Sequence, residues 1–247
     1  MNRILPIAVL IGCAAISLAP AQTNRPSAQD LLDAVVARLP ADPLRMTGDL
    51  IVRKRHGIVV RQLGFELSVN WGKQPAVATY TVRDAFGSDL EQLTITREPG
   101  KEPRFQYSAG SPLQPRSLPD LYAPIQGSDI SWMDLALSFL WWKGGAVARG
   151  DEVLGRPCHV VEVPAPTSGA QAGALYGRAR LWVDKELNML LQAEGVGTDG
   201  RVIRRLWVKS FKKIDDRWMI KDLEVQQFPS LHRTKLTISD VKEVPGA

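Results

Sequence analysis

A strict alternation of apolar and polar side chains at residues 63–71, LGFELSVNW, most constrains what this chain can fold into. The odd positions are all apolar and the residues between them are small or polar, the apolar set being Leu63, Phe65, Leu67, Val69 and Trp71. Successive side chains of a β-strand point to opposite faces, so a period of two places these five on one face. The pattern predicts a half-buried antiparallel strand with one face on a core.

Strand-like runs of this kind recur along most of the chain. They are separated by turn dipeptides such as His56-Gly57 and Asp199-Gly200, and lie near 45–55, 58–71, 76–84, 89–97, 103–107, 158–164, 175–183, 189–197, 201–213, 217–227 and 231–242. About eleven short strands in meander order predict a mainly β protein with a single large antiparallel sheet, curled or closed. A length of 247 residues fits one such domain.

The N-terminus has the features of an export signal. Arg3 precedes an apolar run from Ile4 to Leu18, and Ala19-Pro20-Ala21 is a small-x-small cleavage site. We expect a signal peptide at 1–21 and a mature single domain at 22–247, soluble and periplasmic. An alternative is a lipobox at Leu10-Ile11-Gly12-Cys13, which would leave a lipid-anchored protein beginning at Cys13. With simple cleavage, Cys158 has no partner for a disulfide.

Two helices interrupt the strand pattern. Ser27 to Leu39 has a capping residue, apolar side chains at helical spacing and a stop at Pro40. Residues 131–145, SWMDLALSFLWWKGG, begin with a second capping box and predict a short helix over Leu135 to Leu140 that is apolar on nearly all sides. This helix either fills the core of the curled sheet or acts as a plug or lid over a cavity for apolar ligands.

No motif in the chain predicts catalysis. Gly195 to Gly200 matches the glycine spacing of a dinucleotide site, but a strand follows it where that site needs a helix, so we expect a hairpin turn. Cys158 and His159 are adjacent on a strand, so they point to opposite faces and cannot act as a nucleophile and base. The three histidines have no metal-ligand spacing. We therefore expect no enzyme activity, no cofactor and no metal.

Basic residues gather on one predicted strand: Arg201, Arg204, Arg205, Lys209, Lys212 and Lys213. Because Arg204 and Lys212 fall on the face opposite Arg205 and Lys209, they form no continuous stripe. An exported protein rarely meets nucleic acid, so no nucleic-acid partner is expected. The simplest explanation is that these charges keep an edge strand soluble. The alternative is that they bind anionic lipid headgroups or an acidic protein surface.

Residues 128–242 resemble the bacterial outer membrane lipoprotein-sorting family, relatives of the periplasmic lipoprotein carrier LolA and of a treponemal-lipoprotein-type domain. The similar features are LWVDKE at 181–186, the Asp199-Gly200 hairpin, KKIDDRW at 212–218 and the closing strand Lys235 to Lys242, in that order and spacing. The resemblance implies an unclosed β-barrel of about eleven strands with helices packed in its mouth. It also implies an apolar concave face, which in the carriers receives the acyl chains of lipoproteins.

Together these patterns predict a periplasmic carrier that shelters acyl chains of lipoproteins or related lipids and delivers them towards the outer membrane. An inner-membrane donor and an outer-membrane acceptor are its expected protein partners. Alternation and the apolar segment supply the candidate cavity and lid residues: Leu63, Phe65, Leu67, Val69, Trp71, Trp132, Leu135, Phe139 and Trp142. The alternative function is an envelope sensor on the same fold, with the barrel binding a lipid or peptide signal.

Overall fold

The computed structural model describes residues 25–172, 175–214, 217–230 and 232–244. The expected signal peptide and Cys13 lie outside this part of the chain. Among the residues it covers, no helix has both the length and the apolar character that a membrane span requires.

The structure is one antiparallel sheet of fourteen strands that remains open at both edges. The strands are β1 (Leu44–Arg53), β2 (Val59–Asn70), β3 (Ala76–Arg83), β4 (Asp89–Arg97), β5 (Arg104–Ala109), β6 (Gln114–Arg116), β7 (Ala146–Val147), β8 (Asp151–Val153), β9 (Arg156–Pro164), β10 (Arg178–Asp184), β11 (Leu190–Val196), β12 (Val202–Ile214), β13 (Arg217–Gln227) and β14 (Arg233–Glu243). The predicted mainly β fold with a single unclosed sheet is confirmed. The eleven expected strands are all present, and the sequence missed the short β6, β7 and β8.

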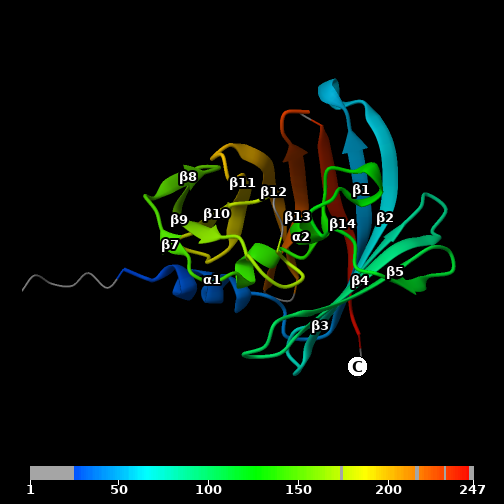
Figure 1. The fold of residues 1–247 in the computed structure, drawn as a ribbon, viewed down its shortest axis with the longest axis horizontal. Coiled ribbons are helices and arrows are strands. Elements are labelled where there is room, and N and C mark those ends of the chain that lie inside the picture. Colours follow the sequence, from blue (N-terminus) through cyan, green and yellow to red (C-terminus); the bar gives the residue numbers. More distant parts are fainter. Residues whose placement is uncertain (1–24, 173–174, 215–216, 231, 245–247) are drawn as a thin grey trace, which may run out of the picture.

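The order of strands in the sheet explains where the middle of the chain must run. The first strand, β1, pairs with the last, β14, and from this pair the order extends through β2 to β5 to β6 on one side and through β13 to β9 to β7 on the other. Because β6 and β7 lie at opposite edges, residues 117–145 must cross the sheet. We call this crossing segment the strap, and Figure 1 shows its helix α2 (Trp132–Leu135) between the two curved groups of strands.

The N-terminal helix α1 (Ala28–Val36) begins at the predicted cap. Ser27 accepts a hydrogen bond from the backbone N–H of Asp30, and the Asp30 carboxylate accepts one from the backbone N–H of Ser27. The helix ends at Val36 rather than Leu39, and its apolar face contacts the strap and β9. It therefore closes one end of the space enclosed by the sheet.

The predicted continuous helix over Leu135 to Leu140 is wrong. The strap contains a 3-10 turn η2 (Ile125–Gly127), the four-residue α2, and a second 3-10 turn η3 (Ser138–Trp141). Leu137, with φ of 46°, adopts the left-handed conformation and separates α2 from η3. The capping box of Ser131 and Asp134 is present as predicted. The middle of the strap, residues 128–136, is buried throughout, with Trp132 only 2% exposed.

The basic strand is not an edge strand, because β12 lies between β11 and β13. Arg204 is buried and paired with Asp134, while Arg205 pairs with Glu194. The prediction that these charges keep an edge strand soluble is therefore wrong. Arg204, the most buried of them, instead holds the strap in place. Cys158 is a free, buried cysteine.

Candidate functional site

An apolar cavity of about 140 Å³ lies between the strap and the sheet. The strap contributes Leu135 to Leu137, Leu140 and Trp141, and α1 with the residues after it contributes Val35, Arg38, Leu39 and Pro40. The sheet supplies the opposite wall with Met46, Phe65, Leu67, Trp71, Tyr80, Leu190, Phe211, Met219, Ile220, Leu223, Leu236 and Ile238. Asn188, Met189 and Trp218 complete the lining, which is dominated by aliphatic, aromatic and methionine side chains. A lining of this composition suits a hydrocarbon ligand.

Four of the nine sequence-predicted residues lie on the wall of this cavity: Phe65, Leu67, Trp71 and Leu135. The others are elsewhere. Leu63, Val69, Trp132 and Phe139 pack in the hydrophobic core, and Trp142 lines a second cavity described below. The alternation assigned the correct face of β2, but it could not tell a residue at the cavity from a residue packed against the strap.

The sequence interpretation missed the half of the wall that comes from the C-terminal strands. Leu236 and Ile238 on β14 and Leu223 on β13 face the same space as Phe65. Alternation in residues 234–238, TKLTI, carries the signal that would have placed Leu236 and Ile238 on one face. The pairing of β14 with β1 places Leu236 opposite Leu50 and Ile238 opposite Gly48, nearly two hundred positions earlier in the chain.

One side of the cavity opens to solvent and leaves apolar side chains uncovered there. Trp218 is 48% exposed, and Leu67, Trp71 and Trp141 are only partly buried. Arg38 is the charged member of this rim, and it is exposed. An apolar opening of this kind costs solvation free energy, so it marks a surface that another molecule can cover.

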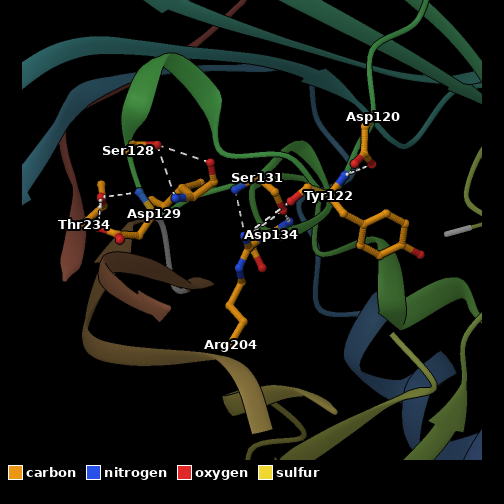
Figure 2. A network of polar contacts seen from close by, with 9 residues as sticks. Asp120, Tyr122, Ser128, Asp129, Ser131, Asp134, Arg204 and Thr234 are labelled. Carbon is orange, nitrogen blue, oxygen red and sulfur yellow. Dashed lines mark hydrogen bonds and ion pairs between the residues drawn. The ribbon is translucent and has the colours of Figure 1, made fainter. Parts of the chain in front are cut away.

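A buried ion pair holds the first half of the strap to the sheet. The Arg204 guanidinium donates to the Asp134 carboxylate at 2.8 Å, with the two side chains 3% and 6% exposed. Asp134 also accepts from the backbone N–H and hydroxyl of Ser131, and Arg204 donates to the carbonyl of Tyr122 at 3.3 Å. Figure 2 shows Asp134 between Ser131 and Arg204. Asp134 thus joins the start of α2 to β12.

A second polar contact lies nearby in the same network. The Thr234 hydroxyl on β14 donates to the Asp129 carboxylate at 2.8 Å and accepts from the Asp129 backbone N–H at 2.8 Å (Figure 2). Burial raises the pKa of Asp129, although the hydrogen bond from Thr234 opposes this. Because breaking one partner of a buried polar pair leaves the other unsatisfied, these contacts fix residues 129–134 firmly.

The second half of the strap is held differently. In η3, Phe139 and Leu140 are buried among apolar side chains, and Trp141 packs under the guanidinium of Arg97, which lies 3.9 Å from the ring centroid. The Ser138 hydroxyl is buried with no hydrogen-bond partner. No ion pair holds η3 within the described chain, so the strap has a firmly anchored first half and a second half that depends on apolar packing.

A second, more polar cavity of about 810 Å³ lies on the other side of Trp141. Its walls are the loop 98–103 between β4 and β5, residues 141–143 of the strap, and the loop that begins at Pro164. Trp141 lines both cavities, so they adjoin at this side chain. In the second cavity, Trp142 donates its indole N–H to the Gln171 side chain at 3.1 Å.

In the described ranges, no group of three or more His, Cys, Asp or Glu side chains is placed to hold a metal ion. The Cys158 thiol is buried, and burial together with Asp184 raises its pKa, which makes a thiolate unfavourable. Burial lowers the pKa of the adjacent His159, whose ring lies on the other face of β9.

The fold of this open sheet is similar to that of several solved structures. A DUF1329 family protein from Desulfovibrio piger is 16% identical, with a TM-score of 0.73 over 89% of this chain and 93% of that one. A domain from Vibrio parahaemolyticus, named for outer membrane lipoprotein sorting, is 14% identical with a TM-score of 0.72 over 89% and 93%. A LolA superfamily protein from Nitrosomonas europaea is 15% identical with a TM-score of 0.67 over 90% and 96%.

The chain therefore has the LolA-like fold, and the predicted resemblance to the lipoprotein-sorting proteins is confirmed at this level. At the level of sequence, one protein-family model, described as that of an uncharacterized protein, matches residues 92–245. This match spans more than half of the chain, so the chain belongs to that family. No curated protein matches the sequence.

Proposed function

We propose that this protein is a non-enzymatic carrier that shelters the acyl chains of lipoproteins or related lipids. The observation that carries the proposal is the apolar cavity between strap and sheet, which has an opening to solvent. An empty cavity costs about 24 cal/mol per Å³, so 140 Å³ left unfilled corresponds to up to about 3 kcal/mol of lost stability. A binding role explains why the chain keeps this space instead of filling it.

The size of the cavity limits what the closed state can hold. A cavity of about 150 Å³ in another protein accommodates one benzene ring, so the 140 Å³ here fits the end of one acyl chain. Each buried CH₂ contributes about 0.8 kcal/mol, so about four methylene groups offset the cost of the empty space. A whole chain requires the cavity to widen.

The structure favours η3 as the part that moves. The first half of the strap is anchored by Arg204 and Asp134, whereas η3 is held by apolar packing and begins after Leu137, a single left-handed residue. Displacing η3 would exchange its apolar contacts for those of the ligand, so the net free energy of loading stays small. A small net cost is what a carrier needs, because it must also release its cargo.

We further propose that residues 22–247 act in the periplasm after removal of 1–21, taking cargo from an inner-membrane donor and passing it to an outer-membrane acceptor. The related fold of the domain named for outer membrane lipoprotein sorting supports this location. If Cys13 is lipidated, the same domain would work from a membrane anchor. Intact mass of the exported protein distinguishes the two forms.

The test is native mass spectrometry on protein purified from a bacterial periplasm without detergent, with lipid extraction of the same sample. We expect bound phospholipid or acylated peptide. Leu67→Asp, which puts a charge on the cavity wall, should abolish this binding while the protein stays folded. The matched control is Val77→Asp, because Val77 is also half-buried but lies on the other face of the sheet, on β3. A ligand-free protein that also ignores added fatty acid and acylated peptide would refute the carrier function.

A further inference from the structure

The guanidinium of Arg97 lacks a counter-charge within the described chain. Arg97 ends β4 and is half-buried, with its guanidinium 3.9 Å from the centroid of the Trp141 ring. No carboxylate or hydrogen-bond acceptor contacts this guanidinium among the described residues. Several other half-buried or buried arginines have such partners: Arg83 pairs with Glu66 and Asp89, Arg180 with Glu162 and Glu194, and Arg204 with Asp134. The half-buried Arg53 also makes no ion pair with the described residues, but it lines neither cavity.

In the ligand-free protein, keeping the Arg97 guanidinium partly buried without a counter-charge costs free energy. Burial lowers the pKa of Arg97 to about 10, opposed only by the Tyr80 hydroxyl. The arginine stays charged at neutral pH, so it is a partly desolvated cation that the fold does not neutralise. Its nitrogen atoms are not among the completely buried, unpartnered atoms, so they keep access to the adjoining cavity.

The position of Arg97 relates it to both cavities. It lines the larger, polar cavity, and the Trp141 ring that it covers lines the apolar cavity as well. Tyr80, whose hydroxyl acts on the Arg97 charge, also belongs to the apolar wall. A ligand with its hydrocarbon end in the apolar cavity and its polar end in the larger one would pass beside the guanidinium.

The other charges around the polar cavity leave room for an anion. Lys143 is exposed at the rim and makes no ion pair with the described residues, whereas Lys101 pairs with Glu98 at 2.6 Å. Glu98 is further neutralised by Arg104, and the remaining carboxylate, Glu102, is exposed. Among the cations that line the polar cavity, the half-buried Arg97 and the exposed Lys143 therefore make no ion pair with the described residues.

We propose that Arg97 binds the anionic group, phosphate or carboxylate, of an acyl lipid whose hydrocarbon chain enters the apolar cavity. This rests on the proposed carrier function and narrows its cargo to anionic lipids. A planar guanidinium matches the two oxygens of either group, and the Trp141 ring beneath keeps it in position. Charged hydrogen bonds in a partly desolvated site are among the stronger ones. Loss of Arg97 should therefore lower the affinity for anionic ligands on the order of tenfold or more.

The experiment is calorimetric titration of the periplasm-purified protein, after lipid removal, with three ligands of one acyl chain: palmitate, palmitoyl-lysophosphatidylglycerol and the neutral monopalmitoylglycerol. Inorganic phosphate is the fourth titrant. Wild type should bind both anionic lipids more tightly than the neutral one and should bind phosphate weakly. Arg97→Met should remove this preference without changing the affinity for monopalmitoylglycerol, and Arg97→Lys should restore part of it.

Arg116→Met is the matched control, because Arg116 is an exposed arginine on β6 that lines neither cavity. Equal affinities for all three lipids in wild type, or a preference lost in Arg116→Met and kept in Arg97→Met, would overturn the anion site and leave the carrier function intact. Tight binding of inorganic phosphate without tighter binding of the anionic lipids would mean that the site takes free phosphate, and would overturn the proposal of a lipid ligand. Failure to bind any acyl ligand would refute the carrier function itself.

A stability measurement separates this role from a structural one. If Arg97 only supported the packing of Trp141, Arg97→Met would lower the melting temperature of the ligand-free protein. An anion site predicts the reverse, because the methionine keeps an apolar side chain over the ring and removes an unpaired, partly desolvated charge. A lowered melting temperature with unchanged lipid preference would overturn the proposal.

Discussion

Filling the apolar cavity from inside tests whether its empty space is kept for a ligand. Ala136 follows α2, is 4% exposed and lines the cavity. Ala136→Leu adds three carbon atoms, which would contribute about 2.4 kcal/mol at about 0.8 kcal/mol each if they entered empty space. The cavity volume of 140 Å³ sets an upper limit of about 3 kcal/mol. Allowing for imperfect fit, we expect the free energy of unfolding to rise by about 1–2 kcal/mol.

The assay pairs urea denaturation of the ligand-free protein with calorimetric titration of a fatty acid. Ala136→Leu should be more stable than wild type and bind the fatty acid at least ten times more weakly. Ala193→Leu is the control, since Ala193 is equally buried, at 4% exposure, but does not line the cavity. That substitution should destabilise the protein by overpacking. Loss of stability in Ala136→Leu with binding unchanged would refute the description of this space as an available binding cavity.

Two further predictions concern the polar contacts that hold the sheet and strap. Arg204→Met leaves the Asp134 carboxylate buried without its cation, so the free energy of unfolding measured by urea denaturation should fall by about 3–5 kcal/mol. Arg45→Met, at an ion pair whose arginine is 52% exposed, should lower it by about 1 kcal/mol or less. For Asp222, burial opposes the hydrogen bonds that lower its pKa from 3.8 to about 2, the first of them from Lys235. Its carboxylate therefore stabilises the fold above pH 4, and this contribution is lost as the pH falls from about 4 to about 2. Asp222→Asn should lower the urea midpoint at pH 7, with the difference from wild type shrinking as the pH falls from about 4 through about 2; a constant difference across that range would contradict the assignment.

The sheet was largely predictable because its strands bury one face and expose the other. Alternation in residues 63–71 placed Phe65 and Leu67 on the inner face, where the structure has them. The short strand β6 was missed because Pro115 lies within it, in a segment whose proline content indicates a connection. Its pairing with β5 at the edge of the sheet tolerates a residue without an N–H group.

The strap was harder to predict, since its conformation depends on partners far away in the sequence. Nothing local marks Leu137 as left-handed, and the apolar residues on both sides of it favour a continuous helix. Nothing in the sequence distinguishes the basic residues of β12 from one another. Only the fold pairs Arg204 with Asp134, seventy positions earlier, and so fixes the strap to the sheet. Trp132 and Phe139 are candidate lid residues because they lie in the apolar segment 131–145, and apolar character alone does not distinguish the wall of a cavity from the core behind it.

The pairing of the first strand with the last makes the cavity a property of the complete chain. Thr47 on β1 lies opposite Asp240 on β14, so the middle of the sheet cannot form until synthesis is nearly finished. Contacts of such long sequence separation slow folding and make it cooperative. A chain truncated before β14 would lose one side of the cavity and the Thr234 contact that helps fix the strap. If the protein is the carrier proposed above, prematurely terminated copies would be unable to bind cargo, and degradation of such fragments would cost the cell no loaded protein.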